Sequence, residues 1–212
     1  MILWILRLIF ISILFFDVLL AWFFLAHRTE YPKIAESKLC NIIEVILFNT
    51  CCYLVTGIIP EDTQVLIKPE LFNNPIIFFG FRIIGIVFIV FHGLLIFKTF
   101  RKRNVIGIQD TKNGLITSGT YGLYRHPIYV GIVGISLGLA LITLNWDGMI
   151  VWPIVLIINI LEAIGEEKFD LIPRFGENYI SYRKKVRSFG NIWYWTIIIT
   201  PVLILILIAQ FY

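Results

Sequence analysis

Long apolar runs separated by short polar stretches restrict the fold of this sequence more than any other feature. Six runs occupy about residues 2–26, 40–59, 75–97, 127–144, 148–164 and 194–210. The first three are long enough to cross a hydrocarbon core of about 30 Å, because an α-helix rises about 1.5 Å per residue. Residues 145–147 alone separate the fourth run from the fifth, which predicts a tight helical hairpin. We therefore expect an all-α fold, a polytopic transmembrane helix bundle of about six membrane segments.

The composition agrees with a membrane bundle. Hydrophobic residues make up 58% of the 212 residues and charged residues only 15%, whereas a soluble domain is about half apolar and about a quarter charged. The first run is too long for a signal peptide and no small-residue cleavage site follows it, so we expect a retained span. Cys40, Cys51 and Cys52 have no metal or disulfide spacing, so no metal is predicted.

The distribution of basic residues predicts the orientation of the chain. The net charge is +4, but the bases lie in short loops between apolar runs, which is typical of anionic headgroups rather than of nucleic-acid binding. Loops 27–39, 98–126 and 165–193 contain 15 of the 18 Lys and Arg residues, while loops 60–74 and 145–147 contain one. The positive-inside rule places the first three loops in the cytoplasm. We expect a multi-pass integral membrane protein whose catalytic loops and active site face the cytoplasm.

The densest motif runs from Thr117 to Gly131 and contains Arg125-His126-Pro127. Proline suits the first turn of a helix, where its missing N–H is no loss, so the motif ends at a helix start. Gly134 and Gly138 follow as a small-xxx-small pair, which lets another helix approach closely. For the Arg-His pair, contact with headgroups at the membrane edge is the alternative to a functional role.

A polar stripe begins inside the fifth apolar run. Asn159, Glu162, Glu166 and Asp170 recur every three or four residues, so they share one helical face. Carboxylates near the hydrocarbon are costly and usually face a cavity or a partner. A helix that simply emerges into water at Glu166 is the alternative. We favour a polar cavity because the stripe starts within the apolar run.

Three blocks in order resemble the isoprenylcysteine carboxyl methyltransferase and phospholipid methyltransferase superfamily of membrane enzymes. They are T-S-G-x-Y-x-x-x-R-H-P-x-Y-x-G at 117–131, the glutamate pair at 166–167 and F-G-x-x-Y-x-x-Y at 175–182. The resemblance covers about residues 105–190. It implies S-adenosyl-L-methionine as cofactor, a cytoplasmic cofactor pocket, and methyl transfer to a membrane lipid or lipidated, isoprenylcysteine-like acceptor.

The resemblance also implies roles for particular residues. Glu167 matches the carboxylate that holds the cofactor, and Arg125 matches a contact to the carboxylate of the cofactor. Cofactor contacts are implied for a set drawn from the loop and both motifs: Gln109, Asn113, Gly114, Leu115, Ile116, Tyr121, His126, Pro127, Ile128, Tyr129 and Glu167. We assign Arg125 and Glu166 to the catalytic set, and Asn159 and Glu162 to substrate binding.

Several alternatives stay open. Eukaryotic isoprenylcysteine enzymes carry an arginine where this chain has Ala163, so the identity of the acceptor does not carry over. Two other classes remain, an NADPH-dependent membrane reductase of the sterol reductase type and a non-enzymatic transporter or scaffold. The roles of Asp17, Glu44, Arg82 and His92, in predicted spans, stay open, as does the oligomeric state.

The expected organisation has three parts. N-terminal transmembrane helices occupy 1–104, a cofactor-binding methyltransferase core with the hairpin occupies 105–193, and a C-terminal transmembrane helix occupies 194–212. The isoleucine-rich composition indicates a prokaryotic cell membrane.

Overall fold

The computed structural model describes residues 2–27, 74–103, 114–144 and 146–211, and throughout these residues the secondary structure is helical, with no strand. The long helices are α1 (Ile2–Ala26), α5 (Pro75–Arg103), α6 (Pro127–Thr143), α7 (Trp146–Glu166) and α10 (Ile192–Phe211). The short ones are the 3₁₀-helix η1 (Gly119–Gly122), the π-helix η2 (Glu167–Leu171), α8 (Ile172–Phe175) and α9 (Glu177–Lys185). The all-α prediction is confirmed for these residues. The predicted span 40–59 and Glu44 lie outside them.

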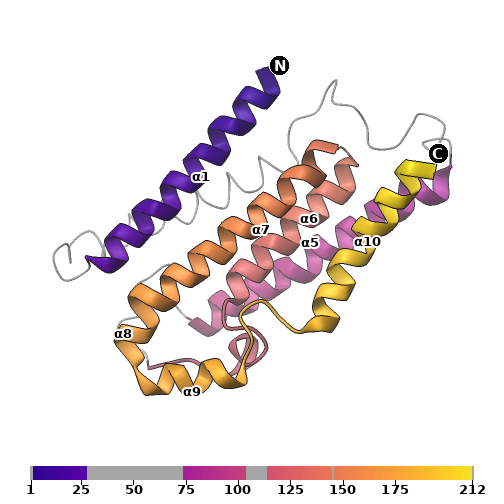
Figure 1. The fold of residues 1–212 in the computed structure, drawn as a ribbon. Coiled ribbons are helices and arrows are strands. Elements are labelled where there is room, and N and C mark those ends of the chain that lie inside the picture. Colours follow the sequence, from indigo (N-terminus) through magenta and orange to yellow (C-terminus); the bar gives the residue numbers. More distant parts are fainter. Residues whose placement is uncertain (1, 28–73, 104–113, 145, 212) are drawn as a thin grey trace.

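The long helices run side by side along a common direction, and the short helices gather at one end (Figure 1). Helix α6 is central, since α5 packs along one side of it and α7 along another, while α1 packs on α7. Both ends of the chain lie at the end opposite α8 and α9 (Figure 1). The polar motifs are thereby collected at one end of an apolar bundle.

The predicted hairpin of the fourth and fifth apolar runs is confirmed. Helix α6 ends at Thr143, and the cap residue Leu144 adopts a left-handed conformation with φ 50° while its N–H donates to the carbonyl of Ala140. Helix α7 begins at Trp146. Leu144 is fully buried, so its side chain fills the core at the position where the backbone reverses. A left-handed leucine is strained and persists only where packing fixes it.

Glycines bring α5 and α6 into contact. A Cβ on Gly85 would lie 2.6 Å from the carbonyl oxygen of Gly138, and a Cβ on Gly138 would lie 2.6 Å from that of Gly85. One turn away, Gly134 lies flat against the ring of His92, which a side chain there would overlap. The predicted role of the Gly134 and Gly138 pair in close helix approach is confirmed.

Apolar side chains fill the contacts between helices and also cover much of the outer surface. One core cluster lies among α5, α6, α7 and α10, and a second joins α1 to α6 and α7 through Leu14, Val18, Ile132 and Val155. Large apolar residues are also exposed along α1, α5 and α10. Two helices, Pro75–Lys102 and Gly148–Phe175, are long and apolar enough to cross a membrane by length and composition, and three shorter apolar helices accompany them. Such a surface is what lipid, rather than water, solvates.

Candidate functional site

The site begins where α7 changes into a π-helix. The N–H of Ile172 donates to the carbonyl of Glu167, five residues earlier. Pro173 follows, and because proline has no N–H and its ring clashes with the preceding turn, a regular α-helix is disfavoured at this point. The wider π turn accommodates the proline without ending the helix, and turns of this kind are frequent at functional sites. Glu166 and Glu167 therefore leave the backbone at the junction of two helical geometries.

Arg125 ties three segments of the chain together. Its guanidinium donates to Oε1 of Glu167, with Nε at 3.0 Å and Nη2 at 2.9 Å. Nη1 donates to the carbonyl oxygens of Arg183 and Val186, both at 3.0 Å, at the end of α9. Its backbone N–H donates to the carbonyl of Arg187 at 3.0 Å. A planar guanidinium suits this forked arrangement of acceptors, so Arg125 fixes the α9 end against the π-helix.

His126 lies between the two glutamates and is almost fully buried. Its Nδ1 is 3.1 Å from Oε2 of Glu166, and its Nε2 is 3.0 Å from Oε1 of Glu167. Burial alone would lower the pKa of His126, but the hydrogen bonds to both carboxylates and their charges raise it above its ordinary value. Burial would raise the pKa of Glu167, but His126 and Arg125 outweigh this effect and lower it. Both directions favour the ionised forms of His126 and Glu167.

Two tyrosines of α9 lie beside this cluster of charged residues. Helix α8 ends at Phe175, and α9 starts at Glu177. The φ of 53° and ψ of −129° of Gly176 between them are open only to glycine at low cost. The reversal turns Tyr179 and Tyr182 inward, and both are buried. The hydroxyl of Tyr182 donates to the carbonyl of Tyr121 at 2.6 Å. The Tyr179 hydroxyl makes no well-formed hydrogen bond, yet burial and the nearby Glu167 carboxylate raise its pKa, so the phenol stays protonated.

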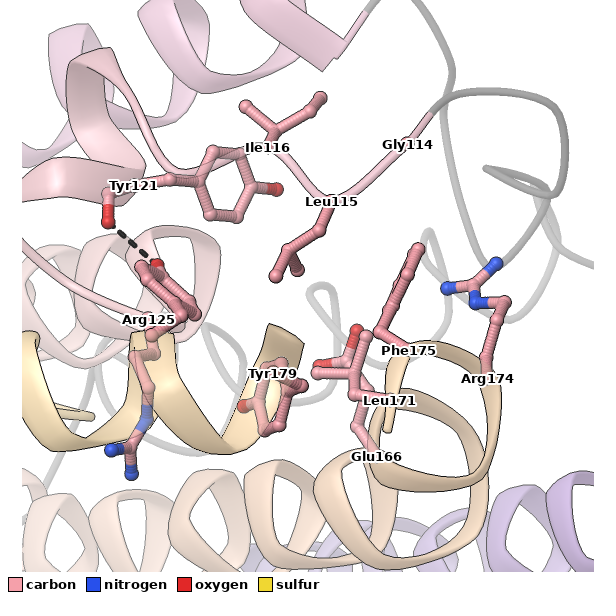
Figure 2. Close-up of a pocket in the computed structure, with 11 residues that line it drawn as sticks. Gly114, Leu115, Ile116, Tyr121, Arg125, Glu166, Leu171, Arg174, Phe175 and Tyr179 are labelled. Atoms are coloured by element: carbon pink, nitrogen blue, oxygen red, sulfur yellow. Dashed lines mark hydrogen bonds between the residues drawn. The ribbon is translucent and has the colours of Figure 1, made fainter. Parts of the chain in front are cut away.

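These elements enclose a pocket with an empty volume of about 450 Å³, part of which is open to solvent. The segment from Gly114 to Ile116 forms one side, and Figure 2 shows Leu115 pointing from it toward Tyr179 and Leu171 on the other side. The lining also includes Tyr121, Arg125, Glu166, Arg174, Phe175 and Tyr182. Arg174 forms an ion pair with Asp170 at 2.8 Å, one helical turn away. The pocket thus combines aromatic rings, a carboxylate and paired cations, and a largely apolar lining with a few polar groups is typical of small-molecule sites.

The predicted site residues fall into three groups in the structure. Gly114, Leu115, Ile116, Tyr121, Arg125 and Glu166 line the pocket. His126 and Glu167 stand behind its wall and bond to the residues that form it, while Pro127, Ile128 and Tyr129 start α6 without being part of the lining. Gln109 and Asn113 lie outside the described residues.

The two residues assigned to substrate binding lie deeper in α7. Asn159 and Glu162 are buried, and neither lines the pocket. The amide of Asn159 donates to the carbonyl of Val155 at 2.8 Å, which is a local helix contact. The polar stripe therefore continues from the pocket into the apolar bundle.

Sequence reasoning gave too little weight to the third motif. Leu171, Arg174, Phe175, Tyr179 and Tyr182 line the pocket, and none was assigned to the site. The signal was present in the F-G-x-x-Y-x-x-Y spacing, which places both tyrosines on one face of a helix after a glycine turn. The sequence pattern does not show that α9 packs back against the site, because this packing depends on contacts to Arg125, about sixty residues earlier.

His92 of α5 has a structural environment. It is buried against Gly134, its Nδ1 is 2.8 Å from the carbonyl of Phe88, and its Nε2 is 3.2 Å from the Tyr194 hydroxyl. These contacts join α5 to α10. Within the described residues no ion pair joins Asp17 to Arg82, and the Arg82 guanidinium instead lies over the ring of Phe78 at 3.9 Å. The same residues contain no group of three or more His, Cys, Asp or Glu side chains placed to hold a metal ion.

Comparison with known proteins gives a consistent family. Residues 81–177 match the family described as phospholipid methyltransferase. Three similar proteins are named protein-S-isoprenylcysteine O-methyltransferase. The one from Xenopus laevis is 39% identical over 82 residues, which are 37% of this chain and 28% of that protein. The one from Schizosaccharomyces pombe is 36% identical over 74 residues (35% and 31%), and the human one is 35% identical over 82 residues (37% and 29%).

The matched region is limited in extent. It spans less than a third of the length of these relatives. No solved structure matches the chain significantly. The family match nevertheless contains α6, α7 and the glutamate pair, and it ends just beyond the turn at Gly176.

Proposed function

We propose that this chain is an S-adenosylmethionine-dependent methyltransferase of the isoprenylcysteine carboxyl methyltransferase and phospholipid methyltransferase superfamily, to which it is similar over residues 81–177. The proposed acceptor is a membrane lipid or a lipidated, isoprenylcysteine-like molecule. The observation that carries the proposal is the pocket between the Gly114–Ile116 segment and α9, which has Glu166 and several aromatic rings on its wall.

The lining fits the chemistry of the proposed cofactor. S-adenosylmethionine carries an ammonium, a carboxylate and a sulfonium, and when bound it supplies an electrophilic methyl group. Glu166 offers a carboxylate for a cationic group, and the rings of Tyr121, Phe175 and Tyr179 offer π faces, which attract cations. Arg125 and Arg174 are the cations of the lining that suit a carboxylate, although each already has an acidic partner.

The remaining cofactor residues have supporting roles in this proposal. The Gly114–Ile116 backbone would border the cofactor, with Gln109 and Asn113 directly before it in the sequence. His126 and Glu167 would act through Glu166 and Arg125, since they touch these residues and not the pocket. Pro127, Ile128 and Tyr129 would anchor the start of α6 under the site.

Methyl transfer to such an acceptor needs alignment more than acid-base chemistry. A carboxylate or thiolate acceptor is already a nucleophile, so the protein would mainly hold nucleophile, methyl carbon and sulfur in line and exclude water. The apolar rings and Leu115 supply the water-excluding wall. Asn159 and Glu162 remain proposed substrate contacts, on the face of α7 that leads from the pocket into the bundle.

A membrane location follows from the apolar surface in this proposal. The exposed side chains of α1, α5 and α10 would face lipid, and the pocket end would face the cytoplasm of a prokaryotic cell. Exposed bases at that end, including Lys98, Arg101, Lys184 and Lys185, support this orientation. The two alternative functions, a reductase and a non-enzyme, gain no support from the relatives.

The test is transfer of a labelled methyl group. Membranes containing the protein would be incubated with S-adenosylmethionine labelled on the methyl group and with N-acetyl-S-farnesylcysteine, and lipids would be extracted. Label on the prenylcysteine or on a membrane lipid, lost in Glu166→Gln, supports the proposal and identifies the acceptor. Absence of label from every fraction, with folded protein, would contradict it.

A further inference from the structure

The position of His126 between two carboxylates has a chemical consequence. Both ring nitrogens lie within hydrogen-bond distance of a carboxylate oxygen, at 3.1 Å for Glu166 and 3.0 Å for Glu167. A neutral imidazole has one N–H, so it can donate to only one of them, and its other nitrogen would face an oxygen lone pair. Only the doubly protonated imidazolium satisfies both contacts while both carboxylates are ionised.

We propose that His126 is a positioning residue which, as an imidazolium, holds Glu166 toward the cofactor pocket and Glu167 toward Arg125, and that loss of its proton weakens cofactor binding. The inference rests on the proposed function, because it assigns how the same pocket is regulated by pH. Glu166 would be the carboxylate that meets the ligand, and Glu167 would be a structural partner of Arg125.

The charges around the ring support this assignment. Glu166 comes from α7, Glu167 from the π-helix, and Arg125 precedes His126 in the chain. From α9, Arg183 lies 3.4 Å from Oε2 of Glu167, and the Tyr179 phenol is close to the same carboxylate. The ring of Tyr129 from α6 stacks on the imidazole of His126. The ring of Phe189, between α9 and α10, also stacks with this imidazole. Arg125 and Arg183 both contact Glu167, whereas Glu166 contacts the ring of His126.

After loss of the proton, His126 could donate to only one of the two carboxylates, and its other nitrogen would face an oxygen lone pair. Two N–H groups of Arg125 donate to Oε1 of Glu167, whose side chain is 9% exposed, whereas that of Glu166 is 20% exposed. Because water stabilises a carboxylate that has lost a charged contact, the more exposed Glu166 is the group that would turn away from the ring and leave the pocket wall. The binding site for a cationic group would then be lost, although Arg125 and α9 stay in place.

The direct test is the protonation state of the three histidines in the full-length protein. Protein labelled with ¹⁵N at histidine would be placed in lipid nanodiscs, and ring nitrogens would be followed by two-bond ¹H–¹⁵N correlation across a pH series. His126→Gln assigns the signal, and His27→Gln, directly after the C-terminal end of α1, is the matched control. We expect His126 to keep both ring protons above the ordinary histidine pKa of about 6.5, and its midpoint to fall in Glu166→Gln and in Glu167→Gln.

A binding measurement then connects the contacts of His126 with Glu166 and Glu167 to the pocket. The affinity for S-adenosylhomocysteine, measured by calorimetry, should fall roughly tenfold as pH rises through the His126 midpoint, a normal size for coupling between two sites. In His126→Gln the affinity should be low and independent of pH, while His27→Gln should behave as the wild type. A His126 midpoint at or below about 6.5 would overturn the proposal. If S-adenosylhomocysteine failed to bind at any pH while the ring stayed doubly protonated, the proposed function would be wrong, but His126 would still be an imidazolium between the two glutamates.

Discussion

At the scale of single residues, Arg125 makes the clearest stability prediction. Its side chain is 11% exposed, and its guanidinium bonds to Glu167 and to two backbone carbonyls of the α9 end. Removing it in Arg125→Ala leaves a buried carboxylate with one partner fewer, and breaking a buried pair costs about 3 kcal/mol. Chemical denaturation in detergent should show this loss. Arg125→Lys should recover only part of it, because an ammonium cannot make the forked contacts. A variant as stable as the wild type would contradict the role given to these bonds.

The same cluster predicts how stability depends on pH. The pKa of His126 is raised on folding, so its contribution is complete below the unfolded value of about 6.5 and is lost as pH rises through the folded pKa. The pKa of Glu167 is lowered, so its contribution is complete above about 4.3 and is lost as pH falls through the folded pKa. Melting temperatures should therefore be highest in mildly acidic buffer and decline on both sides. In His126→Gln the decline on the alkaline side should largely disappear, and its persistence would assign that decline to another group.

At the scale of elements, the contact between α5 and α6 depends on glycine. Gly85→Ala places a methyl 2.6 Å from the carbonyl of Gly138, so the helices must separate or tilt, and overpacking of this kind costs about 1–3 kcal/mol. Gly80→Ala, on the same helix, meets no atom within 4 Å and is the matched control. We expect a lower melting temperature for the first and an unchanged or higher one for the second, since alanine favours helices. Equal effects would mean that helix propensity, not packing, governs both.

How far the sequence predicts these elements depends on whether the determinants are local. The α6–α7 hairpin and the close packing at Gly134 and Gly138 follow from spacing within a few residues, and both are present. The sequence did not predict that Glu166 would line the pocket while Glu167 lies behind its wall, because α7 changes into a π-helix at this pair. The inward position of Tyr179 and Tyr182 depends on Arg125 holding α9 across the chain. A sequence pattern does not contain such distant contacts.

At the scale of the whole molecule, the polar end and the apolar bundle predict an orientation. Helix α9, which carries the exposed Ser181, lies at the pocket end, whereas α5 begins at the opposite end (Figure 1), directly after the exposed Asn74. In a background without Cys40, Cys51 and Cys52, Asn74→Cys should react with a membrane-impermeant maleimide on intact cells. Ser181→Cys should react only after the cells are permeabilised. Reaction of both variants on intact cells would contradict a chain that crosses the membrane with its bases inside.

Whether the pocket binds S-adenosylmethionine is tested most directly by the ligand-dependent thermal stability of the purified protein. A ligand that binds only the folded state raises the melting temperature once its concentration passes the dissociation constant. S-adenosylhomocysteine should raise the melting temperature of the wild type, NADPH should not, and Glu166→Gln should lose most of the shift. A folded protein that responds to NADPH, or to neither ligand, would contradict the account.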